Sequence, residues 1–338
     1  MRRSPAVTTS PSDPFGERSP APLRARLSVL GAAFTVESSN ATALKLAIGA
    51  FGGLPRHRLE PGARRFRVRL VVTPHRSTWP RGAEPPRPIL TAGTELLCAT
   101  VDAGNFAVID VSQGRALVCF SPPMLRCPYH ARYELIELAM VTLASRGRSL
   151  VPLHAACIGA RGSGILLMGS SGAGKSTLAL HALAARMQFL SEDSAFVSVD
   201  TLRVAGTPNY LHVTPDATRF LPEGALLRKI RGSPQIRRRS GARKYEVDVR
   251  RLPARLASAP LELAAIVFLS RRTAAPGNPL EAIGRRALLA RLRREQPYAA
   301  NLPEWREFER RIARVPAYEL RRLPHPDDSV AELRTLLP

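Results

Sequence analysis

The fold of this chain is decided by the stretch Gly164-Ile165-Leu166-Leu167-Met168-Gly169-Ser170-Ser171-Gly172-Ala173-Gly174-Lys175-Ser176-Thr177. Its first five residues form a short apolar run, which predicts a buried strand. The residues from Gly169 to Ser176 fit the pattern G-x-x-x-x-G-K-[S/T], which binds nucleotide phosphates where it joins a strand to a helix. Leu178 to Met187 are rich in Ala and Leu and predict that helix.

Each residue type in this loop has a physical role in holding a phosphate. Glycines let the backbone approach the ligand, so that N–H groups from about Gly172 to Ser176 point at one phosphate. The helix that begins near Lys175 adds the positive end of its dipole. Lys175 would reach the β- and γ-phosphates of ATP, and the Ser176 hydroxyl would bind Mg²⁺. The alternative is a Gly-rich turn that only caps a helix, which needs one or two glycines and no lysine.

Lysine is rare in this chain. Of the 50 basic residues only four are lysines, namely Lys45, Lys175, Lys229 and Lys244. Arginine supplies the generic positive charge, so a position that keeps lysine is more apt to need the chemistry of lysine.

The formal net charge of +23 would attract phosphates, nucleic acid or anionic membrane surfaces. The arginines are scattered, however, with the densest stretches at Arg228–Arg243 and Arg285–Arg294, and only 6% of the residues are aromatic. Basic charge without stacking aromatics or a recognition motif does not favour nucleic-acid binding. We interpret the charge as a solvated basic face, with the recruitment of an acidic protein or peptide as one use.

A chain of 338 residues is long enough for two domains. Residues 1–24 contain five prolines and four serines, and we expect them to be a disordered tail. We expect a mostly β domain that ends in a helix at 25–148, and a phosphate-loop catalytic domain at 149–338.

The sequence predicts a soluble, cytoplasmic protein without a membrane span. No apolar segment follows Arg2-Arg3, so a secretory signal is not indicated. The longest largely apolar run elsewhere, Leu261 to Leu269, is nine residues and too short to cross a bilayer. Cys98, Cys119, Cys127 and Cys157 show neither zinc-ligand spacing nor a disulfide framework, which predicts buried thiols.

Short apolar runs alternate with turns in the N-terminal part. Strands are expected at Arg67–Val72 and Phe106–Val111, and a helix at Ala41–Phe51. Four prolines between Trp79 and Pro88 predict a loop. Apolar residues at intervals of three and four predict a helix with one buried face over Tyr129–Ala144.

Strands and helices alternate beyond Leu150. This pattern predicts an α/β core that binds the nucleotide at the carboxyl ends of its strands. Asp327 and Asp328 favour the start of a terminal helix at Ser329–Leu337. The expected strands are Leu153–Ile158, Ile165–Met168, Phe189–Leu190, Ala195–Val199, Ala264–Leu269 and Ala317–Leu320.

Three segments together resemble the catalytic domain of HPr serine kinase/phosphorylase, namely Leu153–Gly159, Ile165–Leu178 and Phe189–Asp193. That family places a histidine on the strand before the phosphate loop and an acidic pair after the loop's helix. Phosphoenolpyruvate carboxykinases share the core more distantly, and the last seventy residues are similar in layout to shorter HPr-kinase-like proteins found beside peptide-modification genes. The long Gly-containing signature of the bifunctional enzymes is not visible, so the sequence leaves open whether the protein has phosphorylase activity and whether HPr is its substrate.

The resemblance implies that Glu192-Asp193 form a base-and-metal pair. They follow a buried strand, so their carboxylates would emerge beside the phosphate loop. One would hold Mg²⁺ and the other would accept the proton of an attacking hydroxyl, with Ser176 and Asp193 as the expected metal ligands. The family usually has Asp-Asp here, and the longer Glu192 leaves the division of roles open. The alternative is that both residues are ordinary polar residues of a surface turn.

His154 matches the histidine of the family. It would orient the acceptor hydroxyl or keep the acidic pair ionised, although a histidine in an apolar strand is also a common core residue. Lys244 and Arg243 lie where short family members tend to carry a basic residue, and they would contact the transferred phosphoryl group or lie in a solvated loop.

These residues predict a P-loop serine kinase. Mg-ATP would bind at Gly169–Thr177, and Glu192 or Asp193 would act as base in transfer to a serine of a protein or peptide. The alternatives are a nucleotide-dependent switch that hydrolyses ATP slowly and acts through a partner, and a small-molecule kinase. The sequence leaves open the acceptor and whether the protein forms a homo-oligomer.

Overall fold

The computed structural model of the chain describes residues 21–59, 65–76, 79–80, 82–93, 95–274, 277 and 279–338. The expected tail at 1–24 lies almost wholly outside these residues, and Leu23 already belongs to a strand. The chain divides into two compact units. Within the described residues, the first unit comprises the chain up to Leu27, Ala33–Gly52 and Arg65–Leu143, and the second comprises Ser28–Ala32, the segment from Gly53 and Ala144–Pro338.

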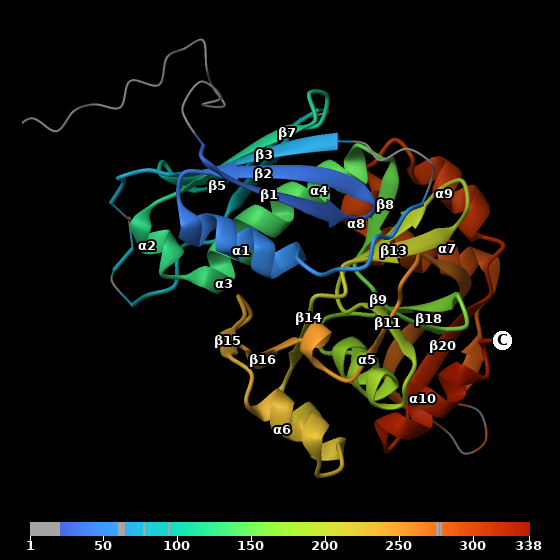
Figure 1. The fold of residues 1–338 in the computed structure, drawn as a ribbon. Helices are drawn as coiled ribbons and strands as arrows, with labels where there is room; N and C mark the ends of the chain where they lie inside the picture. Colours follow the sequence, from blue (N-terminus) through green and yellow to red (C-terminus); the bar gives the residue numbers. More distant parts are fainter. Residues whose placement is uncertain are drawn as a thin grey trace, which may run out of the picture. The chain divides into compact units, whose positions relative to one another are not determined.

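The first unit is built on a seven-stranded sheet in the order β1-β2-β3-β7-β6-β5-β4 (Figure 1). β2, β3 and β7 run parallel, and β7, β6, β5 and β4 run antiparallel. The predicted strands at Arg67–Val72 and Phe106–Val111 correspond to β3 and β6. The strands are β1 (Leu23–Val29), β2 (Ala32–Ser38), β3 (Arg65–Val72), β4 (Ile89–Ala92), β5 (Leu96–Asp102), β6 (Asn105–Asp110) and β7 (Arg115–Phe120).

Helix α1 spans Ala41–Phe51, as predicted, and begins after Asn40, whose side chain accepts a hydrogen bond from the Ala43 N–H. The described residues of the predicted loop at Trp79–Pro88 form neither helix nor strand. The helix predicted at Tyr129–Ala144 is a continuous helical segment with a π-helical middle. The remaining helical elements are α2 (Pro122–Leu125), α3 (Pro128–His130), the π-helix Ala131–Glu137 and α4 (Leu138–Arg146).

All four cysteines are free thiols. Cys119 and Cys157 are buried, as predicted, and burial raises the pKa of Cys119 to about 12. Cys98 and Cys127 are only partly buried, which corrects the expectation for these two.

The second unit has a mixed sheet of ten strands, and the chain is therefore of the α/β class. β10 is parallel to β18, and β18 is parallel to β20, whereas β9 is antiparallel to both of its neighbours, β10 and β11. The strands are β8 (Leu150–Leu153), β9 (Ala156–Ala160), β10 (Ser163–Met168), β11 (Gln188–Ser191), β12 (Ala195–Ser198), β13 (Arg203–Gly206), β17 (Arg255–Leu256), β18 (Leu261–Thr273), β19 (Leu280–Ala282) and β20 (Ala317–Arg322).

One expected strand proved to be two. The apolar run Leu153–Ile158 is interrupted at His154 and Ala155. The physical reason is a change of partners, because β8 pairs with β12 whereas β9 pairs with β10 and β11.

Alternate residues of β10 face two hydrophobic cores, which explains its unbroken apolar run. Ile165 and Leu167 pack in a cluster with residues of α5 and α10, and Leu166 and Met168 pack in a second cluster with residues of α7 and α9. The helices of this unit are α5 (Lys175–Ala184), α6 (Ala225–Arg231), α7 (Arg285–Glu295), α8 (Pro297–Ala300), α9 (Trp305–Ile312), α10 (Pro326–Arg334) and the 3₁₀ turns Pro215–Phe220 and Val249–Arg251.

Two helices are displaced from their predicted ranges by about one turn. α5 begins at Lys175 and ends at Ala184, before Arg186 takes a left-handed φ of 63° of the kind that ends helices. α10 begins at Pro326, with Asp327 and Asp328 in its first turn as predicted, and ends at Arg334. A small antiparallel sheet completes the unit, with β14 (Tyr210–Val213), β16 (Arg243–Asp248) and β15 (Gln235–Arg237) in that order.

A short segment from the N-terminal half of the sequence packs in the second unit. The ring of His57 is 1% exposed and lies between two carbonyl oxygens, 2.7 Å from that of Ala257 and 2.9 Å from that of Gly206. Burial lowers the pKa of His57, although hydrogen bonds to these carbonyls act in the opposite direction. Gly31 has a φ of 79°, and a Cβ there would lie 2.3 Å from the His57 carbonyl oxygen.

Within the described residues, the helices are too short or too polar to cross a membrane.

Candidate active site

Three chain segments of the second unit meet at one edge of its sheet. β9 lies between β10 and β11 and runs opposite to both. Its first residues pair with the ends of its neighbours, Ala156 with Leu167 of β10 and Cys157 with Ser191 of β11. The residues just before β9, just after β10 and just after β11 therefore emerge together. These are His154, the Gly169 loop and Glu192-Asp193.

The loop from Gly169 to Gly174 joins β10 to α5, and three of its glycines have backbone conformations that suit only glycine. Their φ angles are 144° at Gly169, 78° at Gly172 and 107° at Gly174. A Cβ at Gly169 would also lie 3.0 Å from the Ala173 side chain. The strand–loop–helix arrangement expected from the motif is present, with Ser170 and Ser171 in the loop and Ser176 and Thr177 in the first turn of α5.

Lys175 folds back over the loop, and its Nζ donates a hydrogen bond of 2.6 Å to the Gly169 carbonyl oxygen. Lys175 is 7% exposed. Burial lowers the pKa of its ammonium group, and the charges of Asp193 and Glu192 partly oppose this shift. Arg271 of β18 donates a hydrogen bond of 2.6 Å to the Ser171 carbonyl oxygen.

Glu192 links the first turn of α5 to the small sheet. Its Oε1 accepts a hydrogen bond of 2.5 Å from the Ser176 hydroxyl, and its Oε2 lies 2.8 Å from Nδ1 of His212 on β14. His212 Nε2 lies 3.4 Å from Glu246 of β16. Burial alone would raise the pKa of Glu192, but the charge and hydrogen bond of His212 outweigh it and hold the pKa below its ordinary value. Burial likewise disfavours charge on His212, yet Glu192 and Glu246 raise its pKa.

Asp193 contacts different residues from those that Glu192 contacts. Its Oδ1 lies 2.8 Å from His154 Nε2, and its Oδ2 accepts a hydrogen bond of 3.2 Å from Arg238. Burial would raise the pKa of Asp193, but the hydrogen bond and charge of His154, with Arg238 and Lys175, lower it well below its usual range. Asp193 is therefore a carboxylate at neutral pH.

His154 is not on a strand, in contrast to the expectation from the family pattern. It lies in the bend between β8 and β9, which leaves its side chain 53% exposed while Nε2 faces Asp193. Lys244 lies on β16, and its positive charge acts on both Lys175 and Glu192. Arg243 is exposed at the start of the same strand.

The structure adds three side chains that the sequence interpretation missed, namely His212, Glu246 and Arg238. Arg238 belongs to the stretch Arg228–Arg243, which was expected to be a solvated face, yet its side chain is only 21% exposed and pairs with Asp193. The available signal was weak, because one arginine among many and one histidine in a short strand carry no motif.

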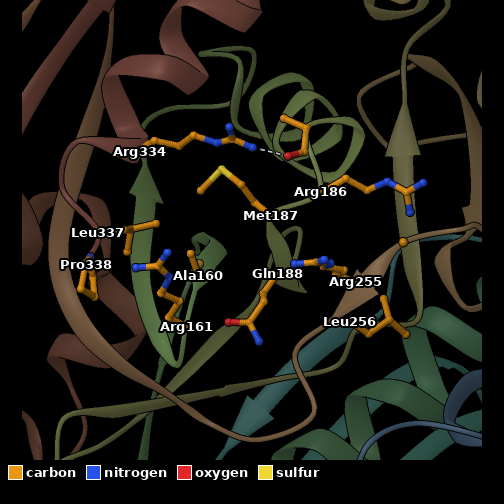
Figure 2. Close-up of a pocket in the computed structure, with 13 residues that line it drawn as sticks. Ala160, Arg161, Arg186, Met187, Gln188, Arg255, Leu256, Arg334, Leu337 and Pro338 are labelled. Atoms are coloured by element: carbon orange, nitrogen blue, oxygen red, sulfur yellow. Dashed lines mark hydrogen bonds between the residues drawn. The ribbon is translucent and has the colours of Figure 1, made fainter.

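The second unit contains two pockets of interest, and only one of them adjoins the loop. A pocket of about 330 Å³ adjoins the loop, and its lining includes Gly172, Gly174, Thr177, Thr214, Phe220 and Arg322. Figure 2 shows a larger pocket of about 830 Å³ in which Met187 lies among Arg161, Arg186, Arg255 and Arg334. Arg161 precedes β10 whereas the loop follows it, so the larger pocket is at the opposite end of that strand. Arg334 donates a hydrogen bond to the Ala185 carbonyl oxygen, which caps the end of α5.

Among the described residues, no three His, Cys, Asp or Glu side chains gather as a ready-made metal site. The Ser176 hydroxyl and the Glu192 carboxylate lie side by side and together offer oxygen ligands for a hard cation. Mg²⁺ takes oxygen ligands, and usually only one or two of them come from the protein. This pair fits the ion that the sequence motif implies.

Comparisons with known proteins give matches among solved structures but not among family models or curated proteins. No family model matches the sequence, and no curated protein matches it. Among solved structures, the chain is similar to the Hpr(Ser) kinase/phosphatase from Coxiella burnetii, at 14% identity and a TM-score of 0.29, over 55% of this chain and 87% of that chain. A TM-score of this size does not establish a shared fold.

Proposed function

We propose that this chain is a P-loop serine kinase, which transfers the γ-phosphoryl group of Mg-ATP to a serine hydroxyl of a protein or peptide. The single observation that carries the proposal is the contact between Ser176 and Glu192, which joins the glycine loop to the acidic pair. A phosphate-binding loop alone would serve a switch equally well. A loop joined to two carboxylates and a histidine has the groups that a transfer reaction needs.

The geometry favours different roles for the two acids. Glu192 contacts Ser176, and these two residues would hold Mg²⁺. Mg²⁺, when bound, would neutralise the charge that develops on the β- and γ-phosphate oxygens. Asp193 contacts His154 and Arg238 instead, which supports a role on the acceptor side. In this assignment Glu192 replaces Asp193 as the expected partner of Ser176 at the metal.

Asp193 and His154 would act together as the base. A carboxylate can only accept hydrogen bonds, so neutral His154 carries its proton on Nε2, and its Nδ1 has a free lone pair. That nitrogen would take the proton of the serine hydroxyl while the serine oxygen bonds to the γ-phosphorus. The bond from this phosphorus to the bridging oxygen of the β-phosphate breaks, and ADP leaves.

The second unit also offers positive charge and space for the phosphate donor. Lys175 would leave the Gly169 carbonyl oxygen to bind the β- and γ-phosphates, and Lys244 and Arg238 add charge near the transferred group. The pocket of about 330 Å³ beside Gly172 and Thr177 would take the ribose and base.

The test is serine phosphorylation itself. The purified chain is incubated with Mg-ATP and candidate peptides from the same organism, and the products are mapped by mass spectrometry. Phosphoserine that forms with the wild-type chain and not with Asp193→Asn would support the proposal. Peptides that remain unmodified while ATP is hydrolysed at the same rate by both forms would refute it.

A further inference from the structure

A buried glutamine pairs with both backbone polar groups of His154. Gln296 lies between α7 and α8 and is 5% exposed. Its Oε1 accepts a hydrogen bond of 2.7 Å from the His154 N–H, and its Nε2 lies 3.4 Å from the His154 carbonyl oxygen. The side-chain amide therefore pairs with one residue as a neighbouring strand would.

His154 needs such a partner because it lies outside both strands that flank it. Neither β8, which ends at Leu153, nor β9, which begins at Ala156, includes it in a ladder. Backbone polar groups that are not paired elsewhere leave a segment free to rotate or require water. With the backbone fixed, the Cα–Cβ bond of His154 keeps the direction from which Nε2 reaches Asp193 at 2.8 Å.

We infer that Gln296 is a positioning residue that holds the His154 imidazole against Asp193. The expected effect on catalysis rests on the proposed function. The positioning of the imidazole by Gln296 does not depend on that function. In the described contacts, Gln296 reaches the acidic pair only through His154. A rival explanation is that Gln296 only fastens α7 and α8 to the sheet.

A double-mutant cycle separates the two explanations. Gln296→Met removes both hydrogen bonds and keeps a similar volume, and His154→Ala removes the imidazole but leaves the backbone that Gln296 holds. If Gln296 acts through the imidazole, Gln296→Met should slow ADP release from Mg-ATP by up to about 100-fold in the wild-type background, with the KM for ATP nearly unchanged. In the His154→Ala background it should cause no further loss. Equal losses in both backgrounds would overturn the inference.

Gln188→Met is the matched control. Gln188 also accepts a hydrogen bond from a backbone N–H, that of Gly162 at 3.2 Å, but it is the first residue of β11, whereas Glu192-Asp193 follow the last residue of that strand. We expect it to leave the rate of ADP release within about twofold of wild type, as for surface changes that touch no special feature.

A second readout needs no enzyme activity. In protein labelled with ¹⁵N-histidine, the ring N–H that His154 donates to Asp193 should give a resolved signal that His154→Ala removes. We expect this signal to persist in Gln188→Met and to vanish or shift in Gln296→Met. A signal unchanged in Gln296→Met would overturn the inference even if the protein is a kinase. A signal lost in a protein that never transfers phosphate would support the positioning while the proposed function fails.

Discussion

His212 and Glu192 form a buried ion pair beside the glycine loop, with Nδ1 and Oε2 2.8 Å apart. The two side chains are 6% and 5% exposed. Burial disfavours the charged form of both side chains, and each charge stabilises the charged form of the other. The pair keeps Glu192 anionic and turned toward Ser176, and Glu246 on the far side of His212 adds a second acceptor.

Removal of His212 should therefore destabilise the second unit. His212→Ala leaves two carboxylates close together in a buried site, and breaking a buried pair in this way costs about 3–5 kcal/mol. Urea denaturation measures the change. The double variant His212→Ala/Glu192→Gln should lose less than the sum of the single variants, because the unpaired charge is gone. A free energy of unfolding within about 0.5 kcal/mol of wild type for His212→Ala would show that the pair contributes nothing.

Lys175→Ala should abolish or greatly weaken ATP binding while the fold stays intact. A charge-assisted hydrogen bond to a phosphate contributes about 1.5–3 kcal/mol, or roughly 10- to 100-fold in affinity. Titration calorimetry with Mg-ATP measures the loss, and Lys45→Ala, an exposed lysine on α1, is the control. Unchanged affinity together with unchanged turnover would exclude the loop as the nucleotide site.

The amide variants of the acidic pair should separate binding from transfer. Asp193→Asn should lower phosphoryl transfer by about 10²- to 10⁴-fold, as expected for loss of general-base function, and ATP should still bind. Glu192→Gln should shift activity to higher Mg²⁺ concentrations. Asp200→Asn changes an exposed residue after β12 and should match wild type. Wild-type rates in both Asp193→Asn and Glu192→Gln would show that the two residues are ordinary polar residues of a turn.

His57 should make the protein less stable in acid. Its pKa in the folded protein lies below the ordinary value of 6.5, so the unfolded chain binds the proton more readily. Stability from this group is complete above about pH 6.5 and falls as the pH drops toward the lowered pKa, by at most about 1.4 kcal/mol per pH unit. Thermal unfolding at pH 7.5 and 5.5 should show a smaller difference for His57→Gln than for wild type. The control is His75→Gln, at a histidine that does not contact Gly206 or Ala257. It should show the same difference in thermal stability between the two pH values as wild type. Identical differences for wild type and His57→Gln would contradict the expectation.

The fate of the γ-phosphate distinguishes a kinase from a switch. A kinase keeps water from the transferring group, so ATP consumption should be slow alone and should rise with the right acceptor. With labelled γ-phosphate, we expect an acid-stable, alkali-labile phosphoserine. If all label appears as inorganic phosphate across a wide acceptor screen, and His154→Ala leaves that release unchanged, the switch is the better explanation.

Local sequence was sufficient for the elements that depend on neighbouring residues. The helix Ala41–Phe51 has the predicted bounds, and the strand, loop and helix around Gly169 follow the predicted order. The ends of helices were predicted less accurately. α5 and α10 each end about one turn early, because chain direction there is set by a left-handed residue or by packing.

The supporting contacts of the site could not be predicted, because they join distant parts of the chain. Gln296 is 142 residues from His154, and Arg238 is 45 residues from Asp193. Neither contact leaves a spacing that can be found in one sequence. The break at His154 was hidden for a related reason, since an apolar run does not show where a chain changes strand partners.

The segment around His57 has a consequence for how this protein can be divided. A fragment that starts at residue 149 contains every residue we assign to transfer, yet it lacks His57 and Gly31, which pack in the second unit. The carbonyl oxygens of Gly206 and Ala257 would lose the imidazole ring that lies against them. Such a fragment should be less stable than the second unit of the full chain, and a single cut in the chain cannot separate the two units. A functional minimal protein must retain the chain from about residue 28.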